Sequence, residues 1–204
     1  MAGSERDRLD VGSPMIFIVY NVGEHAVDAG YEPWLKETDN PFFNAIPGVR
    51  HYANWKLVAP NPAPFGWFDF MALDAHDSLE RVWFNPDLDR FRSEWVRLWG
   101  YGPAPHEMIR FSYWCTCRRS DVSLAADGGW LVLGKGAAPG DIDVVWTVDG
   151  SLSKHFAGVE RADDWLMPAE KRNPLGYDWV GFSLSEPAPI ADGLVLATTC
   201  TARP

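Results

Sequence analysis

Cysteine is scarce in this chain, which excludes a disulfide framework. The 204 residues contain three cysteines, Cys115, Cys117 and Cys200. An odd number without framework spacing is typical of a reducing compartment, so we expect a cytoplasmic location. The Cys-x-Cys pair lacks a His-rich partner motif, and no His-Glu-x-x-His spacing occurs. We therefore predict no metal site and no cofactor.

Basic stripes and long apolar runs are also absent. Lys and Arg number 18 against 28 Asp and Glu, which gives a net charge of −10. Phosphate backbones are bound by clustered Lys and Arg, so we predict no nucleic-acid partner. No apolar run reaches the roughly 18 residues of a membrane span. The apolar segment 14–22 is short and follows mixed charges, which does not fit a signal peptide, and we predict no membrane partner.

Aromatic residues, by contrast, are abundant. The chain has 11 Trp and 11 Phe, which fill cores and also line pockets for flat apolar ligands. The length suits one large domain or two small ones. Residues 1–14 are predicted to form a flexible leader, and the sequence leaves open whether Met15 is the native start.

The first half predicts an alternation of strands and helices. Apolar, β-branched residues predict a buried strand over 15–22. Pro33 suits the first turn of a helix within 31–46, which Pro41 should bend. A clearer helix is predicted over 85–100, where apolar residues recur at helical spacing. Further strands are predicted over 48–58, 67–74 and 108–119. The order β-α-β-β-α-β over residues 15–119 is that of a ferredoxin-like unit.

The second half repeats this order in a reduced form. The segments GVRHYANW, from Gly48, and GVERADDW, from Gly158, share Gly, Val and Trp at the same offsets. Similar order along several elements indicates an internal repeat. Only eight residues, 186–193, separate its last two strands, so its second helix is missing. Its predicted elements are strands over 130–136, 158–168, 177–185 and 196–204 and a first helix over 140–157. We thus predict an α+β fold of two fused ferredoxin-like units, 15–119 and 128–204, whose antiparallel sheets pair into an α/β barrel.

The strand MIFIVYNV, the segment NAIPGVRHYANWKLV and the order of elements resemble the dimeric α/β-barrel superfamily in tandem, single-chain form. Its EthD-like and polyketide-cyclase-like branches are the most similar. The resemblance covers residues 15–204 and implies a cavity between each sheet and its helices. It implies an activity among cofactor-free cyclases, isomerases, lyases and monooxygenases, or haem enzymes, since the fold alone does not give function. Because only the first unit keeps both helices, we predict one pocket, within 15–119.

Strand alternation nominates an acid–base group for that pocket. Strands two and three should be hairpin partners, so His51 and Asp69 could share a face. A His titrates near neutral pH, and an adjacent carboxylate fixes its tautomer. Asn21 and the hydroxyl of Tyr113 could polarise a carbonyl. The predicted substrate-binding residues are Trp55, Trp67, Phe111, Trp95, Phe17 and His25.

Structural interpretations of these residues stay open. His51 could be a hydrogen-bonded or exposed strand-end histidine, and Asp69 could pair with Arg50 or Arg110. Asn21 could satisfy backbone groups at a strand end. His25 could be a solvated loop residue.

We predict a cofactor-independent enzyme, an isomerase, cyclase or lyase, in secondary metabolism or aromatic catabolism. Its substrate would be a small, apolar, aromatic or polyketide-like carbonyl compound, with His51 as acid or base. The alternatives are a non-catalytic small-molecule binding module, a haem- or oxygen-dependent enzyme, and a structural subunit that docks a partner. The sequence leaves homodimer formation open.

Overall fold

A computed structural model describes residues 9–99, 110–124, 126–152 and 176–204. The strands are β1 (Pro14–Tyr20), β2 (Val49–Leu57), β3 (Trp67–Leu73), β4 (Arg110–Ser120), β5 (Gly128–Gly134), β6 (Val144–Ser151), β7 (Trp179–Ser183) and β8 (Gly193–Ala202). The helices are α1 (Glu24–Asp28), α2 (Tyr31–Trp34), the π-helix η2 (Leu35–Asp39), α3 (Asn40–Asn44), α4 (Ser78–Trp83) and α5 (Pro86–Trp99).

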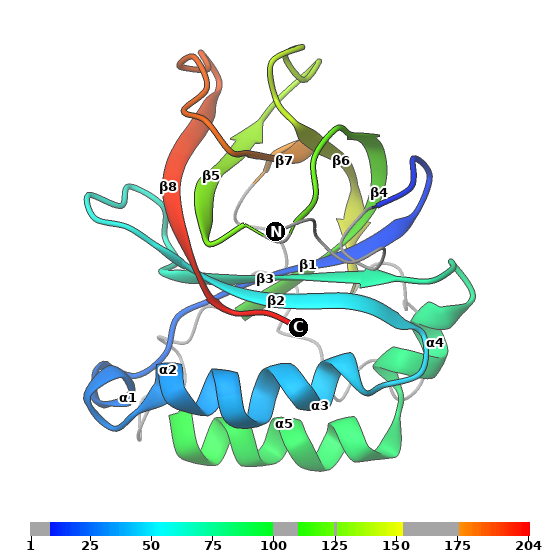
Figure 1. Ribbon diagram of the computed structural model, residues 1–204, viewed down its shortest axis with the longest axis vertical. Helices are drawn as coiled ribbons and strands as arrows, with labels where there is room; N and C mark the ends of the chain where they lie inside the picture. The colour runs from blue at the N-terminus through cyan, green and yellow to red at the C-terminus, as the bar shows by residue number, and fades with distance from the viewer. Residues whose placement is uncertain (1–8, 100–109, 125, 153–175) are drawn as a thin grey trace.

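The strands form one closed barrel in the order β1-β3-β2-β8-β5-β7-β6-β4. Every neighbouring pair is antiparallel. The helices α2, α3 and α5 lie beneath β1, β2 and β3, whereas β5, β6 and β7 form the opposite side of the barrel (Figure 1). Closure satisfies the backbone groups that open sheet edges would leave unpaired.

The predicted fold class, two fused ferredoxin-like units in an α/β barrel, is therefore wrong. The eight strands form one continuous antiparallel barrel, not two units that each carry their own helices. The segment 140–157, predicted as a helix, contains strand β6. Its β-branched residues Val144, Val145 and Thr147 favour an extended backbone, which outweighed the position of the segment in the repeat. The repeat segment 158–168 lies outside the described residues.

Most other predicted elements are confirmed. The predicted strands over 48–58 and 67–74 contain β2 and β3, and those over 15–22 and 108–119 overlap β1 and β4. The strand predicted over 177–185 contains β7, and those over 130–136 and 196–204 overlap β5 and β8. The helix predicted over 85–100 is α5. Its buried residues include Leu88 and Trp95, which face the barrel as the apolar spacing requires.

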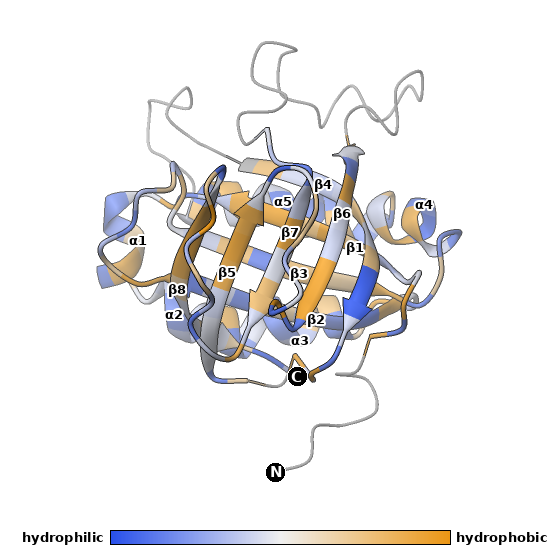
Figure 2. Cartoon of the chain, turned by 90° about the horizontal axis from the view of Figure 1, so that it is seen from above, coloured by the Kyte–Doolittle hydropathy of each residue, from blue (hydrophilic) through white to orange (hydrophobic). Residues whose placement is uncertain are grey.

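Two apolar layers pack on the two faces of the β1-β3-β2 sheet. On β3, Phe68 and Phe70 point into the barrel, whereas Trp67 and Met71 point toward the helices. This alternation follows from the two-residue repeat of a strand. Figure 2 shows long apolar stretches on β5 and β6, which cross over β1, β2 and β3 to close the inner layer.

The described part of the predicted leader packs against the barrel. Leu9 is buried among the interior residues. The backbone N–H of Gly12 donates to the carbonyl of Cys117 at 2.8 Å, and Arg50 pairs with Asp10 at 2.7 Å. Residues 9–13 thus extend the start of β1 along β4.

The last strand connects the two halves of the barrel. β8 pairs with β2 on one side and with β5 on the other. Near its end, the hydroxyl of Thr201 donates to the backbone carbonyl of Asn54 at 3.1 Å. The C-terminal strand therefore supports the middle of β2.

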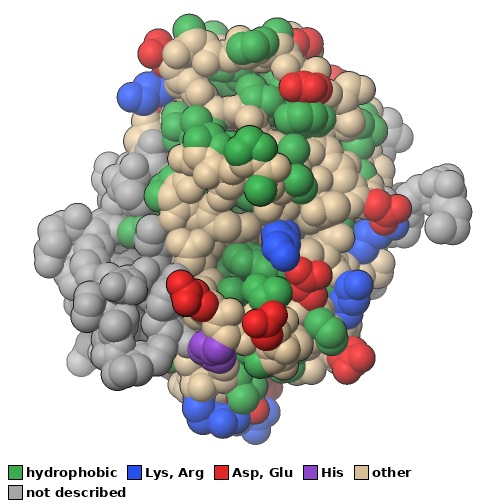
Figure 3. Space-filling model, turned by 90° about the vertical axis from the view of Figure 1, so that its left-hand side faces the viewer, with side chains coloured by type: hydrophobic (Ala, Val, Ile, Leu, Met, Phe, Trp, Pro, Cys, Tyr) green, Lys and Arg blue, Asp and Glu red, His purple; other side chains and the backbone are tan. Residues whose placement is uncertain are grey.

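Among the described residues no helix is long and apolar enough to cross a membrane. On the face shown in Figure 3, the described acidic and basic side chains are interspersed, without a continuous basic stripe.

Candidate functional site

Polar side chains gather on the face of the β1-β3-β2 sheet that lies under the helices. Asp69, at the middle of β3, pairs with Asn54 on β2 and Ile18 on β1. Tyr52 and Asn54 stand on the same face of β2, and Tyr20 ends β1. All four polar side chains are buried. Buried polar groups require hydrogen-bond partners, which makes this face unusual in an otherwise apolar layer.

A π-helix brings a second carboxyl group to this face. The helical segment widens over Leu35–Asp39 before α3 begins at Asn40. Pro41 lacks the N–H that would bond back to Glu37, which weakens an ordinary helical turn at this point. Asp39, the last residue of η2, is 3% exposed. π-helical turns frequently mark functional sites.

Asp39 and Asp69 share two hydrogen-bonding neighbours. The Tyr52 Oη lies 2.9 Å from Asp39 Oδ2 and 2.9 Å from Asp69 Oδ2. The Asn54 Nδ2 lies 2.8 Å from Asp39 Oδ2 and 3.0 Å from Asp69 Oδ1. Asn40 in turn donates to Asn54 Oδ1 at 3.2 Å and orients the amide. The two carboxyl groups are thus parts of one cluster.

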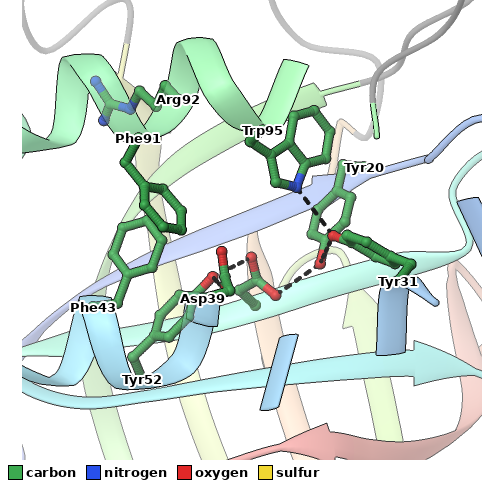
Figure 4. A pocket seen from close by; sticks show the side chains of 9 residues that line it. Tyr20, Tyr31, Asp39, Phe43, Tyr52, Phe91, Arg92 and Trp95 are labelled. Atoms are coloured by element: carbon green, nitrogen blue, oxygen red, sulfur yellow. Dashed lines mark hydrogen bonds between the residues drawn. The ribbon is translucent and has the colours of Figure 1, made fainter. Parts of the chain in front are cut away.

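A chain of hydroxyl groups reaches Asp69 from the helices. The indole N–H of Trp95 donates to Tyr31 Oη at 3.2 Å, and Tyr31 donates to Tyr20 Oη at 3.3 Å. Tyr20 then donates to Asp69 Oδ1 at 3.1 Å. Figure 4 shows these side chains converging from α5, α2 and β1.

These residues line a pocket of about 310 Å³, part of which opens to solvent. Phe43 on α3 and Phe91 on α5 pack edge to face and form one wall, 5.5 Å between ring centroids. Arg92 contributes a cation, whose guanidinium lies 4.0 Å above the ring of Trp83. Most of this volume is open to solvent, and the enclosed part has room for about one water molecule. The complete lining is Tyr20, Tyr31, Asp39, Phe43, Tyr52, Asp69, Phe91, Arg92 and Trp95.

Burial and mutual repulsion change the acidity of the cluster. Burial, and then the negative charge of Asp39, raise the pKa of Asp69 to about 8, although hydrogen bonds from Tyr52, Asn54 and Tyr20 lower it. Burial also raises the pKa of the three tyrosines Tyr20, Tyr31 and Tyr52 well above the ordinary value. At neutral pH, Asp69 is therefore mainly a neutral acid, and the phenols keep their hydrogens.

The structure does not bring His51 and Asp69 together. His51 pairs with Ala72 across the hairpin, whereas Asp69 pairs with Asn54. His51 is fully buried and, with Ala53 and Trp55, belongs to the barrel side of β2. Asp69 is on the opposite face of the sheet, so the predicted catalytic pair is not formed.

Asn21 and His25 stand outside the pocket lining. The Asn21 amide donates to the carbonyl of Pro64 at 3.0 Å and accepts the N–H of Gly66 at 2.7 Å. It therefore holds the loop between β2 and β3, as its structural interpretation predicts. His25, on α1, is exposed, with Nε2 3.4 Å from the carbonyl of Leu98.

The other predicted residues divide between the two apolar layers. Trp95 lines the pocket with Asp69, and Trp67 packs edge-on against Tyr31 at 5.1 Å. The remaining four belong to the barrel interior, where Tyr113 and Phe17 are ring neighbours 6.2 Å apart. These four are Tyr113, Phe17, Trp55 and Phe111.

Sequence reasoning missed most of the cluster. Tyr52 and Asn54 are two residues apart on β2 and therefore share a face. Two polar side chains on one face of an apolar strand could have indicated a polar cluster. Asp39 could have been noticed because it stands two residues before Pro41, where a helix must distort. The contributions of Tyr20, Tyr31 and Arg92 depend on packing between distant elements, which no local pattern encodes.

The described residues contain no group of three or more His, Cys, Asp or Glu side chains placed to hold a metal ion. No family model, curated protein or solved structure matches this chain. The function must therefore be inferred from the cluster itself.

Proposed function

We propose that the chain is a cofactor-independent enzyme that moves a proton on a small, largely apolar carbonyl compound. The observation that supports this most is the buried pair Asp39 and Asp69, bridged by Tyr52 and Asn54 beside an aromatic pocket. Burial beside a second carboxyl raises the pKa of Asp69, so that the pair can supply an acid and a base together. This replaces the predicted pair of His51 and Asp69.

Each group has a role in this proposal. Asp39 is the base that removes a proton next to the substrate carbonyl. Asp69, neutral at pH 7, donates a hydrogen bond or a proton to the carbonyl oxygen as negative charge develops. Phe43, Phe91 and Trp95 supply apolar walls against which an aromatic or polyketide-like body packs at the open side of the pocket. The reaction class is isomerisation, cyclisation or elimination.

Solvent exchange tests the proposal without knowledge of the product. Small aromatic ketones and cyclic enones are incubated with the protein in D₂O, and loss of the proton signal next to the carbonyl is followed by NMR. We expect catalysed exchange, reduced about 100-fold or more in Asp39→Asn and in Asp69→Asn, because general acid–base groups contribute about 10²–10⁴-fold. The matched control Asp28→Asn, an exposed carboxyl on α1, keeps the exchange rate.

Three outcomes contradict the proposal. Ligands that bind the pocket without any exchange would favour the binding module. A Soret band in freshly purified protein would favour the haem-dependent enzyme. Exchange that persists in the variant with both Asp39→Asn and Asp69→Asn would remove the two carboxyls from the chemistry.

A further inference from the structure

The Tyr52 hydroxyl has one hydrogen, yet it stands between two carboxyl groups. A phenol donates one hydrogen bond and otherwise accepts. Its Oη lies 2.9 Å from an oxygen of Asp39 and 2.9 Å from an oxygen of Asp69. If both carboxyls were ionised, the single Tyr52 hydrogen could serve only one of these contacts. The other contact would then place the phenol oxygen 2.9 Å from a carboxylate oxygen with no hydrogen between them. A proton on one carboxyl gives both contacts a hydrogen.

The neighbouring amide does not remove this requirement. Asn54 Nδ2 carries two hydrogens and has three acceptors within reach, which are Asp39 Oδ2, Asp69 Oδ1 and, at 3.0 Å, Tyr52 Oη. When Asn54 donates a hydrogen to Tyr52 Oη, that hydrogen does not lie between Tyr52 and either carboxyl. The missing hydrogen must therefore reside on a carboxyl.

The other hydrogen bonds leave room for that proton on Asp69 Oδ2. Tyr20 donates to Asp69 Oδ1, which leaves Oδ2 to carry the proton toward Tyr52. Tyr52 then gives its own hydrogen to Asp39 Oδ2. Burial and the charge of Asp39 keep the pKa of Asp69 at about 8, which agrees with this arrangement.

We propose that Asp39 and Asp69 share one proton, and that Tyr52 is the bridge through which it passes between them. The groups that face this bridge come from every element packed around it. Burial and the repulsion between the carboxyls oppose ionisation, whereas hydrogen bonds from Tyr52, Asn54 and Tyr20 favour it. Arg92 from α5 also lines the pocket, but its guanidinium lies over the ring of Trp83. The groups around the bridge are Tyr20 from β1, Tyr31 from α2, Asp39 from η2, Asn54 from β2 and Asp69 from β3.

The catalytic use of the bridge rests on the proposed function. After a turnover, Asp39 holds the proton taken from the substrate, and Asp69 has given its own away. Asp39 then passes its proton to Tyr52 Oη while the Tyr52 hydrogen moves to Asp69. One O–H bond breaks and one forms at the phenol, so the starting state returns without a proton from solvent. Tyr52 is thus a positioning residue that acts through the two carboxyls.

Infrared difference titration counts this proton in the intact protein without a substrate. The carbonyl stretch of a buried, protonated carboxylic acid is followed from acid to alkaline pH. We expect it to be present at pH 7, to disappear with a midpoint near about 8, and to be missing in Asp69→Asn. In Asp39→Asn the midpoint falls, because the repulsion is removed. In Tyr52→Phe it rises, because the ionised form loses a donor. The control Asp28→Asn leaves the midpoint unchanged.

Opposite shifts in two variants cannot arise from general loosening of the fold, and circular dichroism checks that each variant is folded. No buried acid band at pH 7 in the unmodified protein would overturn the shared proton, even if every variant failed to fold. An unchanged midpoint in both Asp39→Asn and Tyr52→Phe would overturn the bridge. These results are separate from the exchange assay, so a cluster with a shared proton but no catalysis would contradict only the proposed function.

Discussion

Asp69 shows how far a folded environment can change one residue. Its carboxyl is 4% exposed in the middle of a strand and receives hydrogen bonds from three side chains. Those bonds favour the charged form, but burial and Asp39 oppose it more strongly, and the pKa rises to about 8. The residue is therefore held as an acid at the pH where most carboxyls are bases.

The raised pKa of Asp69 makes stability fall as pH rises. The folded protein holds this proton up to about pH 8, whereas the unfolded chain releases it near its ordinary value of 3.8. The stabilisation is complete below about pH 4 and is lost toward pH 8, with a slope of about 1.4 kcal/mol per pH unit. Denaturant unfolding across this range should show a flatter profile for Asp69→Asn. Parallel profiles for the two proteins would contradict the assignment.

At the scale of elements, the π-helix η2 determines where the Asp39 carboxyl lies relative to the cluster. One widened turn between α2 and α3 determines which side of the helix Asp39 occupies. The neighbouring residues Lys36, Glu37 and Thr38 are exposed, so the distortion serves the buried end of the turn. Successive residues of a regular α-helix are rotated by about 100° around the helix axis. Without the extra residue of the wide turn, Asp39 would therefore point away from the cluster.

Deleting the exposed Thr38 should convert η2 to an ordinary helical turn. We expect helix content to be kept, but Asp39 to rotate away from Tyr52. The repulsion on Asp69 then disappears and its infrared midpoint falls, as in Asp39→Asn. The substitution Thr38→Ala, which keeps the length, should leave the midpoint unchanged. A deletion variant with the original midpoint would show that the wide turn does not place Asp39.

At the scale of the whole molecule, the same sheet carries two independent faces. Phe70, next to Asp69 in sequence, packs inside the barrel against Phe17, Trp55, Phe68, Trp146 and Phe182. The inner face supplies stability, and the outer face carries the polar cluster.

Substitutions at adjacent residues should separate these two contributions. Phe70→Ala creates a cavity in the interior and should lower the free energy of unfolding by about 3–5 kcal/mol. It should leave the Asp69 midpoint near its original value where the variant is folded. Asp69→Asn should have the reverse effects, a small change in stability at about pH 4, where Asp69 is protonated in the folded protein, and no acid band. Denaturant unfolding and the infrared titration measure both, and a large midpoint shift in Phe70→Ala would contradict independent faces.

Local patterns allowed the elements to be predicted better than their assembly. The helical spacing of apolar residues such as Leu88 and Trp95 predicted α5. The two-residue repeat of a strand also accounts for the opposite faces of Asp69 and Phe70 on β3. The apolar spacing did not determine the hairpin register. That register places Asn54, not His51, opposite Asp69. A shift of this size reverses the face that a residue occupies, which is why the predicted pair failed.

The hydrogen bond from the Thr201 hydroxyl to the backbone carbonyl of Asn54 limits which parts of the chain can be expressed alone. Every residue that lines the pocket belongs to the first half of the chain, which invites expression of that half alone. Such a fragment would lose β8, leave β2 with an unpaired edge, and remove the support behind the amide that joins the two carboxyls. The pocket residues are contiguous in the gene, but their arrangement depends on the end of the chain.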